Sequence, residues 1–156
     1  MRAQFYLIPA ALVAAAPVQA RVFMDIAAAQ RTMFPHAKFR ELAIPASAEA
    51  LSLGMITRTW KVSTGGWFIV DQVEGKGDVV TYALALDDNG IVQRLEILEC
   101  SADYDTVTLP RWRQQFVGKQ EAYELSDVRT ISGSTLSSRH ITQGVQRILS
   151  TFRPPA

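Results

Sequence analysis

Apolar and polar residues alternate along two stretches in the middle of the chain, VVTYALAL at 79–86 and IVQRLEIL at 91–98. Period-two alternation is typical of strands with one buried face. In the first stretch that face carries Val80, Tyr82, Leu84 and Leu86. The intervening letters DDNG contain an Asn-Gly pair, which favours a tight turn. The pattern predicts a β-hairpin over residues 79–98.

Further strands are predicted upstream, at TWKV (59–62) and WFIVDQV (67–73), with STGG between them. Two helices are expected before these strands. One covers 22–34, with apolar contacts from Phe23, Ile26 and Met33, and is stopped by Pro35. The other follows Pro45, with Ser47 as a possible cap.

The C-terminal third reads as helical. PRWRQQFVG predicts a short helix from Pro110 to the helix-ending Gly118. The last segment carries one apolar stripe at helical spacing: Ile141, Val145, Ile148, Leu149 and Phe152. This order of helices and strands predicts a single α+β domain with an antiparallel sheet, the central hairpin and packed helices.

The first twenty residues differ from the rest. Arg2 precedes an apolar run from Phe5 to Ala16, and the small residues Val18 and Ala20 fit a cleavage site before Arg21. We therefore expect residues 1–20 to be a secretory signal peptide and 21–156 to be the mature domain. A membrane anchor is less favoured, because the run is short and contains Pro9.

Charge and cysteine content narrow the function further. Without residues 1–20, Lys plus Arg falls from 16 to 15 and equals the 15 acidic residues, so no electrostatic footprint for nucleic acid is present. The lone Cys100 has no partner for an intrachain disulfide, and the sequence has no cysteine or histidine cluster for a metal. Export without disulfides is typical of a bacterial periplasmic protein.

The letters ISGSTLSS, at residues 131–138, directly precede the apolar stripe of the last helix. Amide groups at a helix start carry partial positive charge and bind anions, and Gly133 lets the backbone approach a ligand closely. Hydroxyl groups here are equally suited to capping the helix, so both a cap and a phosphate cradle stay open. A serine hydrolase fits poorly, because no GxSxG surrounds these serines.

The segment ISGSTLSSRHITQGVQRIL resembles the FMN-binding domain family, which includes flavin-carrying subunits of Rnf-type and sodium-pumping redox complexes. The likeness spans about residues 77–150, with PRWRQQFVGK and the hairpin followed by Glu99 also similar. In this family a threonine within an Asp-x-x-(Ser/Thr)-Gly-Ala-Thr motif is joined to FMN through a phosphoester. Thr135 matches that threonine, with Ser132 and Gly133 in their expected places.

The resemblance implies FMN as cofactor and no metal or catalytic residue. Its implied cofactor-binding residues are Thr135, Ser132, Gly133, Ser134, Leu136, Ser137, Ser138, Arg139, Glu99 and Trp112. Arg139 would pair with the phosphate. Trp112 would be an aromatic wall of the flavin site, with Phe116 and Tyr104 as further candidates, and its arginine neighbours suggest partial exposure.

Two positions depart from the family motif. Arg129 stands where the family has aspartate, and Ser134 stands where it has alanine. Arg129 reverses the charge at a position that would help the flavin transferase or position the loop. Ser134 adds a hydroxyl beside the acceptor.

The resemblance implies a periplasmic electron carrier rather than an enzyme with its own substrate. Its partners would be a periplasmic FAD:protein FMN transferase and a membrane or periplasmic redox protein. The alternative is a non-redox binding or assembly module of the same fold that has lost covalent flavinylation.

Overall fold

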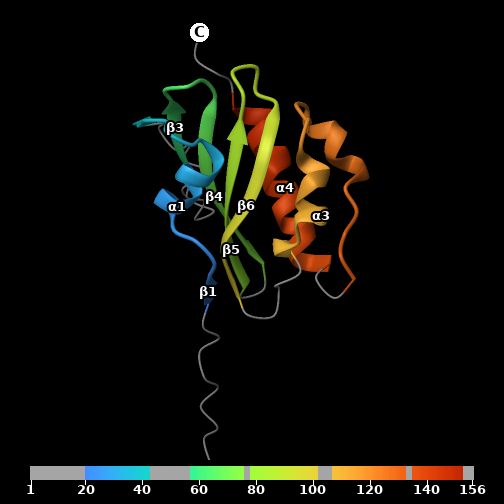
Figure 1. Cartoon of the computed structure of the whole chain (residues 1–156). Helices are drawn as coiled ribbons and strands as arrows, with labels where there is room; N and C mark the ends of the chain where they lie inside the picture. Colours follow the sequence, from blue (N-terminus) through green and yellow to red (C-terminus); the bar gives the residue numbers. More distant parts are fainter. Residues whose placement is uncertain (1–19, 43–56, 76–77, 102–106, 133–134, 153–156) are drawn as a thin grey trace, which may run out of the picture.

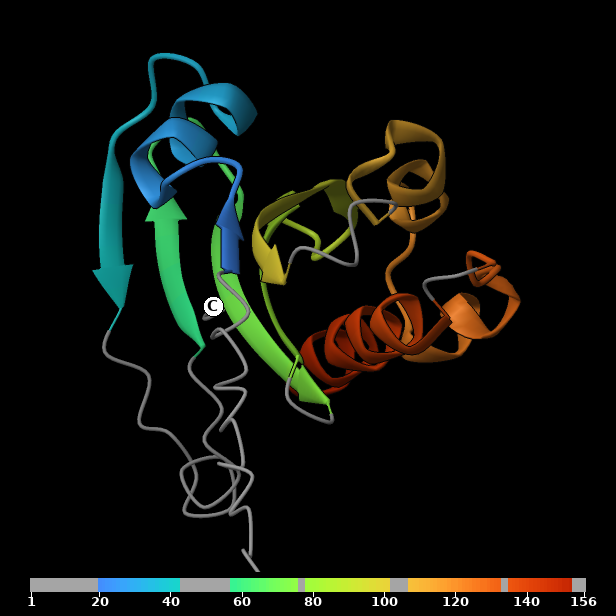
Figure 2. The ribbon, with the colours of Figure 1, turned by 90° about the horizontal axis from the view of Figure 1, so that it is seen from below.

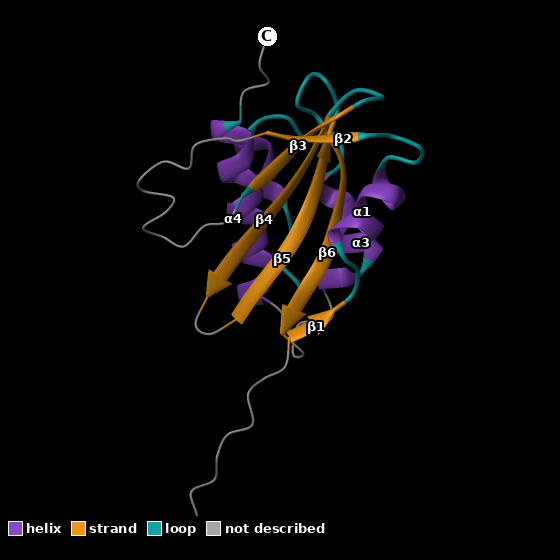
Figure 3. Cartoon of the chain, turned by 90° about the vertical axis from the view of Figure 1, so that its left-hand side faces the viewer, coloured by secondary structure: helices purple, strands orange, loops and turns teal. Residues whose placement is uncertain are grey.

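A computed structural model of the 156-residue chain describes residues 20–42, 57–75, 78–101, 107–132 and 135–152. Six strands form one antiparallel sheet (Figure 1). Their order across the sheet is β1 (Ala20–Val22), β6 (Val92–Ser101), β5 (Asp78–Leu86), β4 (Trp67–Gly75), β3 (Arg58–Val62) and β2 (Phe39–Leu42). Strands β2 to β6 are neighbours in sequence order, and β1 pairs with the end of β6 (Figure 3).

Helices cover both faces of the sheet (Figure 2). The long helix α4 (Thr135–Thr151) and the short α3 (Pro110–Arg113) pack on one face, and α1 (Ile26–Met33) packs on the other. Two 3₁₀ helices, η2 (Gln114–Phe116) and η3 (Ala122–Asp127), connect α3 to α4. The predicted single α+β domain with an antiparallel sheet is confirmed. None of the helices in the described ranges has the length and apolar character needed to cross a bilayer.

The predicted hairpin is β5 and β6, joined by a turn at residues 87–91. The Asp87 carboxylate accepts hydrogen bonds from the backbone N–H groups of Asn89 and Ile91, both at 2.9 Å. Gly90, the glycine of the Asn-Gly pair, has a φ of 83°, a conformation that side chains disfavour. The residues between the two strands therefore form the tight turn that was predicted. The strands predicted at 59–62 and 67–73 are β3 and β4.

The N-terminal prediction is only partly right. The helix begins at Ile26 rather than at 22, because the Asp25 side chain accepts a hydrogen bond from the Ala28 N–H and caps the helix there. Val22 instead belongs to β1. The sequence pattern did not predict β2 or η3. The helix expected after Pro45 and residues 1–19 of the predicted signal peptide (1–20) lie outside the described residues, and the last residue of that peptide, Ala20, belongs to β1.

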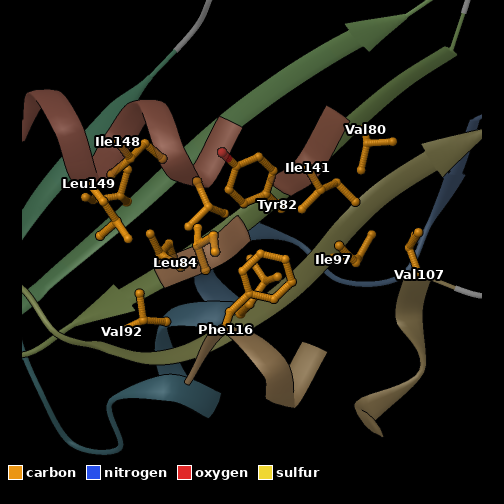
Figure 4. Packing of buried hydrophobic residues seen from close by; sticks show 14 of the residues in the cluster. Val80, Tyr82, Leu84, Val92, Ile97, Val107, Phe116, Ile141, Ile148 and Leu149 are labelled. Atoms are coloured by element: carbon orange, nitrogen blue, oxygen red, sulfur yellow. The ribbon is translucent and has the colours of Figure 1, made fainter. Parts of the chain in front are cut away.

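The main core lies between α4 and the sheet. Apolar side chains from β5 and β6 meet the stripe of α4 and Phe116 of η2 (Figure 4). All four hairpin residues expected to face inward are buried here, as are the four stripe residues that lie on α4. The fifth, Phe152, is partly buried and packs edge-on against Trp67 with ring centroids 5.3 Å apart. Both predicted patterns are confirmed.

A buried carboxylate joins α4 to the sheet. Asp71 of β4 is fully buried, and it accepts hydrogen bonds from the Tyr82 hydroxyl at 2.6 Å and from the Thr57 hydroxyl at 2.8 Å. Arg147 of α4 forms an ion pair with the same carboxylate. Three residues earlier on α4, Gly144 gives the helix room to lie against these groups, because a Cβ there would be 2.6 Å from the Tyr82 hydroxyl.

We expect Gly144→Ala to lower the free energy of unfolding by about 2 kcal/mol. The added methyl group would overlap Tyr82 and Val73, a cost only partly offset by the higher helix propensity of alanine. Urea denaturation measures the change. Gln143→Ala, at the exposed neighbouring position, serves as the control and should change stability little. A Gly144→Ala protein as stable as the control would contradict the close approach.

The pKa of Tyr82 is raised well above the usual tyrosine value, first by burial and then by the negative charge of Asp71. Unfolded Tyr82 therefore ionises at lower pH than folded Tyr82, and its stabilising contribution is lost as the pH rises above about 10. We expect the stability difference between wild type and Tyr82→Phe to narrow there by up to about 1.4 kcal/mol per pH unit. Urea denaturation from about pH 8 to about pH 11 measures it. Parallel pH curves for the two proteins would rule out the shift.

Candidate functional site

The candidate site lies at the N-terminal end of α4, where Thr135 is the first helical residue. Thr135 and the adjacent Leu136 are exposed, the latter by 44%. The Thr135 hydroxyl donates a hydrogen bond of 3.3 Å to the carbonyl oxygen of Ile131. No acidic residue lies in the first turn of α4, so no carboxylate opposes the positive end of the helix dipole.

Two further hydroxyl residues of the first turn face inward. Ser137 and Ser138 are buried, with exposed fractions of 2% and 0%. The Ser138 hydroxyl accepts a hydrogen bond from the Ile131 N–H at 3.4 Å and donates one to the Thr135 carbonyl at 3.1 Å. The backbone of Ile131 is therefore held through both its N–H and its carbonyl by hydroxyl groups of α4. The hydroxyl of Ser138 therefore connects the first turn of α4 to Ile131 in the segment that precedes the helix.

The other motif residues divide into three groups. Ser132 and Arg139 are exposed near the start of α4. Gly133, Ser134 and Tyr104 lie outside the described residues. Arg129 is also exposed, so the charge reversal at this position falls on the surface of the protein.

Helix α3 contacts the backbone of Arg129, which lies a few residues before α4. Trp112 is only 5% exposed, so the partial exposure inferred from its arginine neighbours is wrong. Adjacent positions on a helix point about 100° apart, and charged neighbours therefore say little about the residue between them. The Trp112 ring packs edge-on against Phe116, and its indole N–H donates a 2.9 Å hydrogen bond to the Arg129 carbonyl.

Gln115 binds the same backbone unit. Its amide oxygen accepts a hydrogen bond from the Arg129 N–H at 2.9 Å, and its amide nitrogen lies 3.5 Å from the Arg129 carbonyl oxygen. No pattern in the sequence points to Gln115, because a half-buried glutamine next to a second glutamine gives no signal that relates it to a backbone segment 14 residues away.

Arg113 fixes α3 itself to the edge of β6. Its guanidinium pairs with the buried carboxylate of Glu96 at 2.6 Å and donates to the carbonyl oxygens of Leu95 and Thr108 at 2.8 and 3.0 Å. Arg94 pairs with the other oxygen of Glu96. Charge-assisted contacts of this kind have defined geometry, so α3 is held as a fixed support for the loop.

Glu99 does not join this site. Its sheet partner is Thr81, while the flanking pair Val80 and Cys100 faces the core beneath α4. Side chains of successive strand residues point to opposite faces, so Glu99 lies on the face of the sheet that α1 covers. A register shift between Thr81 and Tyr82 contributes to this orientation.

The described part of the chain offers a small pocket of about 250 Å³ at the far end of α4. Its lining residues are Leu86, Asn89, Gly90, Gln120, Glu121, Leu149 and Phe152. Leu149 is fourteen positions beyond Thr135, about 21 Å along the helix. None of the motif residues lines this pocket. The described ranges also contain no group of three or more residues suited to hold a metal ion.

The start of α4 has the chemistry that a phosphate ester requires. Thr135 presents a hydroxyl at the surface of a 17-residue helix, at the positive end of its dipole. Arg139 lies exposed one turn later and forms no ion pair within the described chain, and Leu136 adds an apolar surface beside the hydroxyl. These residues fit a phosphate-bearing group with a flat apolar part.

Residues 75–150 match the family model for the FMN-binding domain. This part of the chain belongs to the FMN-binding domain family. The match covers β5, β6, α3 and nearly all of α4, and it confirms the resemblance and FMN as the cofactor. No curated protein and no solved structure matches the chain.

We expect Ser138→Ala to lower the free energy of unfolding by about 1–2 kcal/mol, because it removes the acceptor of the Ile131 N–H and a side-chain donor to the Thr135 carbonyl. Amide hydrogen exchange at Ile131 should accelerate in the same variant. The matched control is Ser150→Ala, an exposed serine of α4 whose hydroxyl bonds only within the helix. Equal effects of the two substitutions would exclude a special role for Ser138.

Proposed function

We propose that this protein is a periplasmic electron-transfer protein that carries FMN as a phosphoester on Thr135. The observation that carries the proposal is the exposed hydroxyl of Thr135 at the start of α4, within the segment that matches the FMN-binding domain. FMN, when bound, accepts and donates electrons, and the protein determines where it is held and what surrounds it.

The attachment has a simple chemical balance. The Thr135 oxygen forms a bond to the phosphorus of the FMN half of FAD, and the bond from that phosphorus to the bridging oxygen breaks. AMP leaves with the bridging oxygen, and the hydroxyl proton is released. A periplasmic FAD:protein FMN transferase is the partner that we propose for this step.

The neighbouring residues have supporting roles in this proposal. Arg139 and the amide groups at the start of α4 balance the negative charge of the phosphodiester. Leu136 offers an apolar surface to the flavin. The buried Ser137 and Ser138 hold the first turn against the core and leave Thr135 directed to solvent.

A covalent tether suits an exported carrier, because a cofactor lost from the protein would not be recovered outside the cytoplasm. The proposed location rests on the signal-like residues 1–20, the balanced charge of residues 21–156 and the single cysteine. We propose a membrane or periplasmic redox protein as the electron-transfer partner.

The second candidate is a binding or assembly module of the same family without covalent FMN. Arg129 favours it, since an exposed cation replaces the family aspartate at a position where a transferase would approach. The backbone of Arg129 is held by Trp112 and Gln115 irrespective of its side chain. The substitution therefore acts on the partner rather than on the loop.

The intact mass of the mature protein, co-expressed with the flavin transferase of its own host, tests the proposal. We expect a mass increase equal to one FMN ester, and yellow fluorescence that stays with the denatured protein in a gel. Thr135→Ala should remove both, whereas Thr135→Ser should retain them because it keeps the hydroxyl group. Ser132→Ala serves as the control for a neighbouring hydroxyl.

Three results would contradict the proposal in different ways. Flavin that separates from the denatured wild-type protein excludes the ester and supports loose binding. A wild-type protein without flavin absorbance supports the non-redox module. A Thr135→Ala protein that still carries the adduct moves the attachment to another residue.

A further inference from the structure

The side-chain amide of Gln115 meets the backbone of Arg129 on both of its polar groups. The oxygen accepts from the Arg129 N–H at 2.9 Å, and the nitrogen faces the Arg129 carbonyl oxygen at 3.5 Å. Trp112 donates to the same carbonyl at 2.9 Å. The segment just before the attachment loop is therefore held by α3 and η2, which are attached to the sheet through Arg113 and Glu96.

This held residue is connected to the Thr135 hydroxyl by a short series of contacts. Arg129 lies two positions before Ile131, and the Ile131 carbonyl accepts the hydrogen bond from the Thr135 hydroxyl. The Ile131 N–H is held by Ser138. The backbone from 129 to 131 is thus fixed at both ends, by η2 at one end and by α4 at the other.

We infer that Gln115 is a positioning residue for the attachment of FMN to Thr135, acting through the backbone of residues 129–131. The inference rests on the proposed function. Gln115 takes no part in forming or breaking a bond. It restricts the backbone of residues 129–131, and the Ile131 carbonyl in turn orients the Thr135 hydroxyl toward the phosphorus of FAD. Restriction of this kind increases the rate of a transfer step.

Gln115 is better suited to a test than Trp112. Trp112 belongs to the core, so its removal would leave a cavity. Gln115 is only partly buried, and its neighbour Gln114 is an exposed glutamine that makes none of these contacts. The chain therefore supplies a matched control of the same residue type in the same 3₁₀ helix.

The experiment measures flavinylation of the mature full-length chain in vitro, with FAD and the flavin transferase of the host, over a range of acceptor-protein concentrations. Gln115→Met keeps the length of the side chain and removes both polar groups. We expect its kcat to fall about tenfold, with KM changed by less than about twofold, because the hydroxyl is presented correctly less often while the docking surface is unchanged.

Two further measurements separate positioning from stability. Gln115→Glu keeps an acceptor for the Arg129 N–H, so we expect it to recover most of kcat, and Gln114→Met should behave as wild type. Amide exchange at Arg129 should accelerate in Gln115→Met and stay slow in Gln115→Glu. The Tm of each variant, measured on the same samples, shows whether the whole domain has been weakened.

The outcomes distinguish this inference from the proposed function. No label on wild type, or a label on Thr135→Ala, overturns the proposed function and the positioning role with it. A wild type labelled at Thr135 together with a Gln115→Met protein of unchanged kcat overturns the positioning role alone. A loss of kcat that Gln115→Glu does not recover, and that follows a lowered Tm, also overturns it.

Discussion

The close contact between α4 and β4 is the constraint on which the rest of this domain depends. It needs a glycine at 144, because any larger residue would strike the Tyr82 hydroxyl. It also needs three partners for the buried Asp71 carboxylate, which come from β5, from α4 and from Thr57. A buried ion pair adds little net stability, but removing one partner is costly, and such pairs can favour one arrangement of packed elements over others. Here the pair sets the position of α4 along the sheet.

This position determines where Thr135, the proposed attachment residue, lies. Arg147 is held against β4, and Thr135 lies twelve residues earlier, about 18 Å along the same helix. The first turn of α4 is therefore held against the core, with Ser137 and Ser138 buried and Thr135 exposed, and the backbone of Arg129 just before it is held by α3 and η2. An attachment residue at such a point combines exposure with a fixed direction, which a residue on a free loop would lack.

Much of the fold follows from local patterns. The hairpin, the neighbouring strands and the stripe of α4 each depend on a repeat of two or of about 3.6 residues, which a single sequence shows directly. The first helix begins at Ile26 and not at residue 22, because the capping side chain of Asp25 decides where the helix starts more strongly than alanine content does. The short β2 depends on pairing with β3, and η3 combines a local capping box of Glu121 and Glu124 with packing of Leu125 in the core.

The site was less predictable than the fold, because most of its contacts join segments that are distant in the sequence. Thr135 was identified by motif, but the burial of Trp112 and the face of Glu99 depend on the direction in which each side chain points. The contact of Gln115 with Arg129 joins two backbone regions that no local pattern relates. The hydrogen bond between the Ser138 hydroxyl and the Ile131 N–H also depends on the folded arrangement, although Ser138 itself belongs to the motif.

The hydrogen bond from Thr135 to Ile131 has a consequence for the proposed attachment of FMN to Thr135. The Thr135 oxygen donates this bond through its only hydrogen, and an ester oxygen has none. In the proposed product this bond would therefore be lost, and the Ile131 carbonyl would accept from water or from another donor instead. In the proposed reaction the domain holds its acceptor hydroxyl with a contact that the reaction itself removes, so the free protein and the proposed flavin-bearing protein would differ in the hydrogen bonding of Ile131 beside the cofactor.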